Sequence, residues 1–245
     1  MTAVPHHPSA GLAFKQRLAA RLPSLVVNVD HPSASLVEFI GRLGVDAVFF
    51  DCEQGSPDVE SVEHMARAAR LAGVASLVRL WSRDAWMIER MLLRGIDGIV
   101  VPRVDDEATA RAVVETVRYV LPAAHARTCV IVQIESAEAL HALEAMLRID
   151  GIDAYFVGPV DLSKSLGHGG RIDGPEMAGI IRTTLERIAG AGRASGMLVD
   201  EATVATFAAA GASLLYCHAN DFIRIGAGLF RARIVAPTGA RMLQR

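Results

Sequence analysis

The chain has 245 residues, of which 51% are hydrophobic, 21% charged and 5% aromatic, and its formal net charge is −2. This balance excludes a disordered or collagen-like chain, and the lack of a basic stripe disfavours nucleic acid and anionic membrane as partners. The three cysteines lie far apart and outside any CxxC pair, which predicts free thiols in a reducing compartment. Because the sequence also shows no apolar signal segment and no run of about 18 apolar residues, we expect a cytoplasmic protein.

Eight short apolar runs follow one another along the chain. They consist almost entirely of Val, Ile, Leu and Phe, as in strands that are buried on both faces. The runs cover residues 24–29, 46–51, 76–80, 98–102, 129–135, 154–159, 196–199 and 213–217. The segments between them have helical periodicity. Ser56-Pro57-Asp58 predicts a helix start with Ser56 as the N-cap, Ser136 predicts another start, and Gly95 predicts the end of a helix that starts near Asp84.

Eight strands and eight helices in strict alternation within about 250 residues are typical of a (β/α)8 TIM barrel. The alternative, a doubly wound parallel sheet, usually has a glycine-rich fingerprint after its first strand, and no such fingerprint follows residues 24–29. We therefore predict a single TIM-barrel catalytic domain over residues 24–232. An N-terminal extension (1–23) precedes it and a C-terminal tail (233–245) follows it.

Polar side chains gather at the predicted carboxyl ends of the strands, where TIM-barrel enzymes have their active sites. Any one of them is equally well explained as a private ion pair, but the whole set exceeds what a structural barrel needs. The set comprises Asn28, Asp30, Asp51, Glu53, Arg79, Gln133, Glu135, Gly158, Pro159, Asp161, Asp200, His218 and Asn220.

Two of these residues, Glu135 and Asp161, follow adjacent strands, so their carboxylates can reach one point. Two carboxylates without a neighbouring histidine or thiolate suit a hard cation, Mg²⁺ or Mn²⁺; the alternative is a pair of unrelated loop acids. The only lysines are Lys15, before the first strand, and Lys164, in a polar loop after Asp161. Neither position desolvates an amine, which disfavours a Schiff-base mechanism.

Five segments at these strand ends match the motifs of one known family. They are FFDCEQGSPD (49–58), LVRLWSRD (77–84), IVVPRV (99–104), VQIES (132–136) and VGPVDLSKSLG (157–167). With them the chain resembles the HpcH/HpaI family of metal-dependent pyruvate aldolases. The similarity extends from about Leu25 to Phe230, and the QIE and GP-x-DLS motifs are its most specific parts.

The resemblance implies Glu135 and Asp161 as metal ligands, with Gln133, Asp51 and Glu53 holding metal-bound waters. It also implies that Arg79 clamps a 2-oxo acid, pyruvate or oxaloacetate, whose carboxylate contacts backbone groups at Gly158, Pro159 and Val160. The metal and Arg79 would then stabilise the enolate oxyanion. Members of the family are commonly hexamers, trimers of dimers that exchange their last helix, so a homo-oligomer is expected.

One departure from the family pattern concerns the general base. The family has D-x-E-H after the second strand, and the histidine is the base; here that position is Gln54, which cannot take a proton near neutral pH. The acid that orients the histidine stands just before the glycine that ends the helix after the third strand. Here that position is Leu93 or Arg94, so both members of the pair are replaced.

Three interpretations follow. In the first, the protein is a carbon–carbon lyase whose base is another group, such as a metal-bound water, His218 or Asp30; His218 is equally well a substrate-binding or loop-packing residue. In the second, it condenses acetyl-CoA with oxaloacetate, as a siderophore-pathway citrate synthase branch of the family does, or it decarboxylates oxaloacetate, which needs no base. In the third, it binds a 2-oxo acid without turnover, which the intact metal pair and clamp disfavour.

Overall fold

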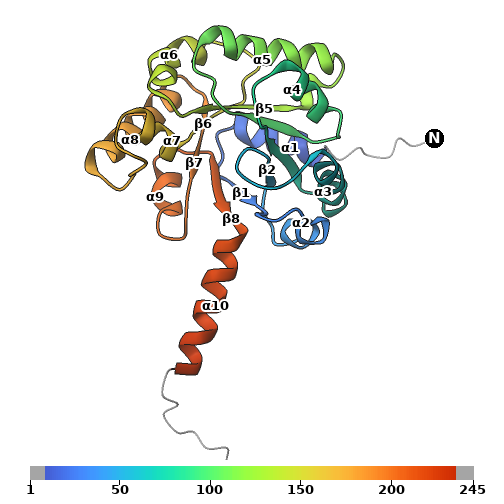
Figure 1. The fold of residues 1–245 in the computed structure, drawn as a ribbon, viewed down its shortest axis with the longest axis vertical. Coiled ribbons are helices and arrows are strands. Elements are labelled where there is room, and N and C mark those ends of the chain that lie inside the picture. The colour runs from blue at the N-terminus through green and yellow to red at the C-terminus, as the bar shows by residue number, and fades with distance from the viewer. Residues whose placement is uncertain (1–8, 236–245) are drawn as a thin grey trace, which may run out of the picture.

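The computed structural model describes residues 9–235 and shows a closed barrel of eight parallel strands in sequence order, β1 to β8 (Figure 1). The predicted TIM barrel is therefore confirmed, and each predicted apolar run overlaps one strand. The strands are β1 (Ser24–Asn28), β2 (Ala47–Asp51), β3 (Ala75–Arg79), β4 (Gly98–Val101), β5 (Cys129–Ile134), β6 (Ala154–Val157), β7 (Ala194–Leu198) and β8 (Leu214–His218).

Helices surround the barrel and connect successive strands, as parallel pairing requires. Two of them are additional to the expected eight: α1 precedes the first strand, and the short α7 follows β6 directly. The helices are α1 (Ala10–Ala19), α2 (Ala34–Gly41), α3 (Val59–Ala72), α4 (Ala85–Leu92), α5 (Glu107–Val120), α6 (Ala137–Leu147), α7 (Pro159–Ser165), α8 (Pro175–Gly190), α9 (Val204–Ala209) and α10 (Ala219–Val235), with a 3₁₀ turn η1 (His125–Arg127).

The predicted helix boundaries hold except at α3. Asp84 and Ser136 are the N-caps of α4 and α6, and Gly95 follows α4 in the left-handed region, with φ +78°. The prediction of Ser56 as N-cap of α3 was wrong. The N-cap is Asp58, whose carboxylate accepts hydrogen bonds from the amide and hydroxyl of Ser61.

The barrel interior is packed by alternate residues of the strands, because successive side chains of a strand point to opposite faces. Ala47 and Phe49 of β2 and Ala75 and Leu77 of β3 belong to this inner cluster. Helix α1 closes the amino end of the barrel with the buried side chain of Phe14. Part of the expected extension (1–23) therefore packs into the barrel, whereas residues 1–8 and 236–245 lie outside the described residues. The division into extension, barrel and tail stays a prediction.

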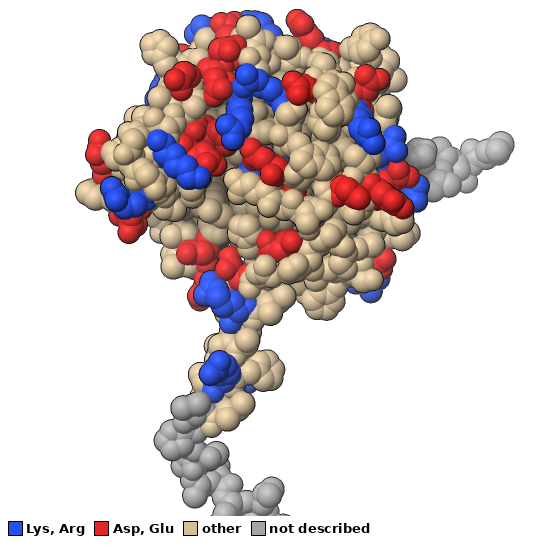
Figure 2. All heavy atoms as spheres, in the orientation of Figure 1, with Lys and Arg blue, Asp and Glu red and all other residues tan. Residues whose placement is uncertain are grey.

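Helix α10 leaves the barrel instead of packing along it (Figure 1). Large apolar side chains on it are exposed, among them Ile223, Leu229, Phe230 (74% exposed) and Ile234. Charged side chains of both signs are intermixed on the barrel face in Figure 2, whereas much of α10 is uncharged. Within residues 9–235, no helix is long and apolar enough to cross a membrane.

Candidate active site

The inward-facing rows of the strands change from apolar to polar at the carboxyl end of the barrel. On β3 the row Ala75–Leu77 continues to Arg79, and on β8 the row Leu214–Tyr216 continues to His218. The same period of two places further polar residues at this mouth, namely Asn28, Asp51, Gln133 and Glu135. Strand geometry alone therefore gathers most of the predicted site residues.

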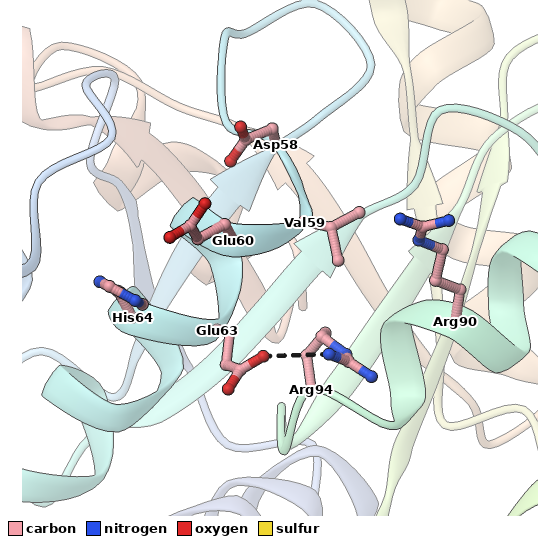
Figure 3. A pocket seen from close by; sticks show the side chains of 7 residues that line it. All are labelled: Asp58, Val59, Glu60, Glu63, His64, Arg90 and Arg94. Carbon is pink, nitrogen blue, oxygen red and sulfur yellow. Dashed lines mark hydrogen bonds and ion pairs between the residues drawn. The ribbon is translucent and has the colours of Figure 1, made fainter.

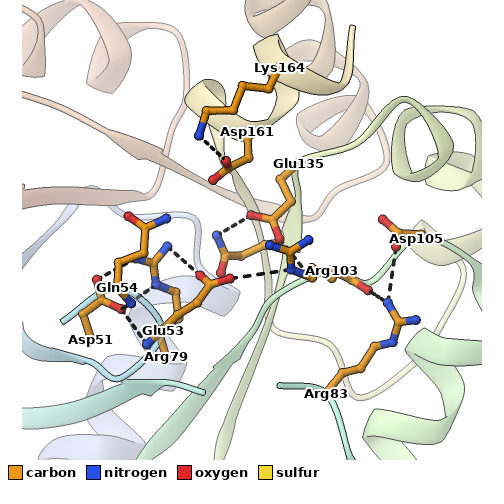
Figure 4. Close-up of polar contacts among 11 residues, drawn as sticks. Asp51, Glu53, Gln54, Arg79, Arg83, Arg103, Asp105, Glu135, Asp161 and Lys164 are labelled. Carbon is orange, nitrogen blue, oxygen red and sulfur yellow. Dashed lines mark hydrogen bonds and ion pairs between the residues drawn. The ribbon is translucent and has the colours of Figure 1, made fainter. Parts of the chain in front are cut away.

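Arg79 is held by two carboxylates from the end of β2 (Figure 4). Its Nε and Nη2 donate to the two oxygens of Asp51 at 2.8 and 2.6 Å. Its Nη1 lies 3.2 Å from Oε2 of Glu53, an ion pair without hydrogen-bond geometry. The Arg79 side chain is only 13% exposed. The fork to Asp51 fixes the plane of the guanidinium and leaves Nη1 facing the rest of the mouth.

Glu135 is a buried carboxylate at the end of the β5 row. Oε1 accepts the backbone N–H of Arg103 at 2.7 Å, and Oε2 accepts the side-chain amide of Gln133 at 3.0 Å. The pKa of Glu135 is raised to about 6, mainly by burial and also by the nearby charges of Glu53 and Asp161, although the hydrogen bond from the Arg103 amide opposes the shift. The pKa of Glu53 is raised for the same main reason, burial, although Arg79 opposes the shift.

Asp161 lies in the first turn of α7 and accepts a hydrogen bond from Lys164 at 2.9 Å. Gly158 is the N-cap of this helix, and a Cβ there would stand 3.0 Å from Cβ and 3.1 Å from Oε2 of Glu135. A larger residue at position 158 would therefore press on Glu135 and shift its carboxylate. Lys164, expected in a loop, is a helical residue that pairs with the predicted metal ligand.

The residues of this mouth fit a divalent cation. Asp51, Glu53 and Glu135 are largely buried beside a single buried cation, Arg79, so the interior of the site carries an excess of negative charge. The Oε1 atom of Gln133 is buried without a hydrogen-bond partner and can accept from a water. Among residues 9–235 no three or more His, Cys, Asp or Glu side chains are placed to bind one metal ion. A cation at this mouth would therefore have two protein carboxylates as ligands and would take the others from water and substrate. Two carboxylates that leave positions for water and substrate are typical of Mg²⁺.

Gln54 and His218 lie beside this cluster and line a neighbouring cavity of about 280 Å³, together with Asn28, Asp30 and Asp51. The Nδ1 atom of His218 is 2.6 Å from Oδ1 of Asp30. Asp200, in contrast, is engaged locally by Thr203. The structure thus brings the predicted metal pair, Arg79 and their polar neighbours together, and places His218 with Gln54 at one cavity.

The expected position of the acid that would orient the base is on the outside of the barrel. Leu93 is exposed there, and Nη1 of Arg94 donates to Oε2 of Glu63 at 3.0 Å. This ion pair borders a surface pocket between α3 and α4, which Figure 3 shows from close by. Neither side chain carries a carboxylate that could orient a base at this position.

Two functional contacts were missed by the sequence analysis. Arg103 binds Glu135 through its backbone amide, in a left-handed conformation with φ +55° that no residue pattern predicts. Its guanidinium is exposed, with Nε 3.9 Å from Oε1 of Glu53. The pairing of Asp30 with His218 was also missed, because the two residues are 188 positions apart in the sequence.

A barrel mouth that joins buried carboxylates to one buried arginine is suited to stabilising an enolate, and comparisons with known proteins identify the class of enzyme as an aldolase-type carbon–carbon lyase. The sequence model of the HpcH/HpaI aldolase/citrate lyase family matches residues 25–223. The chain belongs to that family of carbon–carbon lyases, as its motifs indicated.

One relative and two solved structures illustrate the similarity. The hydroxypyruvate/pyruvate aldolase of Agrobacterium fabrum is 30% identical over 237 residues, covering 87% of this chain and 89% of that protein. An HpcH/HpaI aldolase/citrate lyase family protein from Burkholderia cenocepacia superposes with a TM-score of 0.84 at 26% identity, covering 91% of this chain and 99% of that one. The citrate synthase SbnG, at 24% identity and a TM-score of 0.80 over 90% of this chain and 97% of that one, shares the fold.

Proposed function

We propose that the protein is a lyase, dependent on Mg²⁺ or Mn²⁺, that cleaves a small 4-hydroxy-2-oxo acid to pyruvate and an aldehyde. The observation that carries the proposal is the position of Glu135: a buried carboxylate whose pKa is raised to about 6, next to Asp161 and across from Arg79. A bound cation would neutralise this excess of negative charge, which explains why several carboxylates are buried together at the mouth. The similarity to a hydroxypyruvate/pyruvate aldolase supports pyruvate as the product.

Five residues of the mouth have roles in this scheme. Glu135 and Asp161 hold the cation, and Gln133 accepts from a water beside it through its free Oε1. The bound cation would supply Lewis-acid stabilisation of negative charge. Arg79 donates from Nη1 to the keto oxygen of the substrate and to the enolate oxygen that this atom becomes, while Asp51 holds the guanidinium in place.

The substrate carboxylate is expected at the start of α7. The N–H of Gly158 already donates to the carbonyl of Ile134 at 3.0 Å, and Pro159 has no N–H. Val160 is therefore the member of the expected trio whose amide is offered to the carboxylate, since the first N–H groups of a helix have no partner within it. Gly158 contributes by the space it leaves, and Pro159 by fixing the helix start.

The test is the release of pyruvate from a series of 4-hydroxy-2-oxo acids by protein stripped of metal and resupplied with Mn²⁺ or Mg²⁺. Pyruvate is followed with lactate dehydrogenase and NADH. Asp161→Asn should lose nearly all activity, whereas Glu115→Gln, which changes an exposed glutamate of α5, should retain it. No metal-dependent pyruvate release from any member of the series would overturn the proposal.

A second candidate function is the condensation of acetyl-CoA with oxaloacetate. The observation in its favour is Gln54, because the family's usual base for aldol chemistry is absent from that position. Incubation with oxaloacetate and Mn²⁺, with and without acetyl-CoA, separates the two functions. Thiol release that needs both substrates supports the synthase, and pyruvate without thiol supports the lyase or an oxaloacetate decarboxylase. Binding of pyruvate without turnover would leave a 2-oxo acid binding protein.

We also propose that the protein is a homo-oligomer in which a second copy covers α10. The support is the exposed apolar face of this helix, which projects from the barrel (Figure 1). Phe230→Asp should therefore lower the molar mass measured by light scattering. Phe39→Asp, at an exposed phenylalanine of α2, is the matched control and should leave the mass unchanged. An equal mass for wild type and Phe230→Asp would contradict the oligomer proposed here.

A further inference from the structure

The cavity beside the Arg79 cluster contains a histidine–aspartate pair at the barrel mouth. His218 ends β8 and Asp30 follows β1, two strands that pair directly, with Asn28 opposite His218 in the register. The Nδ1 atom of His218 lies 2.6 Å from Oδ1 of Asp30. The Asp30 side chain is 9% exposed and that of His218 is 39% exposed, so the carboxylate is inside and the imidazole reaches the open space.

Asp30 is positioned by a network that costs backbone strain. Its φ is +60°, an uncommon conformation for a residue other than glycine. Oδ1 of Asn28 accepts its N–H at 3.1 Å, and its Oδ2 accepts the N–H of Asn220 at 2.8 Å. Strain of this kind persists where the surroundings fix it, and it often marks a functional site.

The pairing selects the tautomer of the neutral imidazole. A carboxylate is an acceptor, so the proton of the neutral ring lies on Nδ1 and points to Asp30. Nε2 then carries the lone pair. The ring is held from a second side by Tyr216, which meets it edge to face with centroids 5.2 Å apart and whose hydroxyl accepts from Asn28 at 2.9 Å. This arrangement of a base and an orienting carboxylate is the one used by general-base histidines.

The place of the pair in the mouth connects it to the site of cleavage. His218 and Gln54 line the same cavity, and so does Asp51, which holds Arg79 with both of its oxygens. The inward rows of β3 and β8 bring Arg79 and His218 to the same end of the barrel. A substrate whose keto oxygen lies at Arg79 thus has the cavity of His218 next to it.

We infer that His218, oriented by Asp30, is the general base of the reaction and takes over the role that Gln54 cannot perform. The inference rests on the proposed function. In cleavage, Nε2 takes the proton of the 4-hydroxyl group and the O–H electron pair forms the aldehyde carbonyl. The C3–C4 pair becomes the C2–C3 double bond of the pyruvate enolate, and the π pair of the keto group moves onto its oxygen, which faces Arg79. The proton then goes to C3 and yields pyruvate. His218 is the catalytic residue, and Asp30 is a positioning residue.

Two reactions of the same site separate the base from the rest of the machinery. Exchange of the methyl protons of pyruvate in D₂O requires a base that removes a proton from C3. Decarboxylation of oxaloacetate reaches the same enolate by loss of CO₂ and requires none. Both are followed by proton NMR with Mn²⁺-free, Mg²⁺-loaded protein, and spontaneous decarboxylation is subtracted.

His218→Gln should lower the rate of proton exchange about 100-fold or more, which is the contribution expected of a general base. The rate of oxaloacetate decarboxylation should stay within about threefold of the wild type, because that reaction needs no base. Asp30→Asn should lower kcat for exchange about tenfold with an unchanged KM for pyruvate, and added imidazole should restore part of the exchange in His218→Gly. His64→Gln, at an exposed histidine of α3, is the control and should behave as wild type.

The possible failures differ. If wild-type protein neither decarboxylates oxaloacetate nor binds Mg²⁺, the proposed function itself fails. If it decarboxylates oxaloacetate but does not exchange the protons of pyruvate, or if His218→Gln exchanges them at the wild-type rate, the inference about His218 is overturned. A variant that loses both reactions equally would show that His218 supports the structure of the site and does not move the proton.

Discussion

Replacing Glu135 by glutamine should change the stability of the metal-free protein in a pH-dependent way. Burial, together with Glu53 and Asp161, raises the pKa of Glu135 from 4.5 to about 6. The folded chain therefore holds this proton more tightly than the unfolded chain does. The contribution of Glu135 to the free energy of unfolding is therefore highest below its pKa in the unfolded chain. It is lost as the pH rises through its pKa in the folded chain, about 6. At 1.36 kcal/mol per pH unit, the loss is about 2 kcal/mol.

Glutamine removes this penalty and also removes a hydrogen-bond acceptor. Glu135 accepts from the Arg103 amide at 2.7 Å and from Gln133 at 3.0 Å, and a glutamine carbonyl satisfies only one of the two in the same geometry. The lost bond costs about 1 kcal/mol at every pH. Glu135→Gln should therefore be less stable than wild type by about 1 kcal/mol near pH 4.5, and more stable by about 1 kcal/mol at pH 8.

Urea unfolding in EDTA at the two pH values measures this difference. The change in the free energy of unfolding between wild type and Glu135→Gln should itself shift by about 2 kcal/mol from pH 4.5 to pH 8. Glu115→Gln, on the exposed face of α5, should show no such shift. If the free energies of unfolding of wild type and Glu135→Gln differ by the same amount at both pH values, the conclusion that burial raises the pKa of this carboxyl group is refuted.

Three further predictions concern the mouth and the floor of the barrel. Gly158→Ala should weaken Mn²⁺ binding about tenfold or more in a titration, because its Cβ would stand 3.0 Å from Cβ of Glu135; unchanged affinity would contradict the packing. Arg79→Lys should lower kcat for pyruvate release about 100-fold, since lysine cannot form the fork to Asp51 and also face the substrate; an effect on KM alone would refute the role in enolate stabilisation. Phe14→Ala should cost about 3–5 kcal/mol in urea unfolding and leave Mn²⁺ affinity as it is, because Phe14 is buried at the opposite end of the barrel.

The sequence predicted the barrel because its signals are local. Each strand is a continuous apolar run, and the period of two then carries Arg79, Gln133 and His218 to one end. The order of the strands also placed Glu135 beside Asp161, and the family motifs added their expected role as metal ligands. Such local patterns are reliable signals, because a parallel strand that is buried on both faces requires apolar side chains at nearly every position.

The contacts that the sequence did not predict depend on tertiary structure. Asp30 and Arg103 adopt positive φ without being glycine, which the surrounding hydrogen bonds impose and the residue types do not suggest. Asp58 displaced Ser56 as the cap of α3 because both residues are good caps and only the path of the loop decides between them. The fit of α1 beneath the barrel likewise depends on packing, not on a motif.

Glu135 and Asp161 are the proposed ligands of the divalent cation. Titration of metal-stripped protein with Mn²⁺, followed by electron paramagnetic resonance with and without oxalate as a mimic of the enolate, tests this assignment most directly. The wild type should bind one Mn²⁺ per chain and bind oxalate only when the metal is present, whereas the Glu135→Gln, Asp161→Asn double variant should bind neither. Equal Mn²⁺ binding by wild type and a correctly folded double variant would contradict the account.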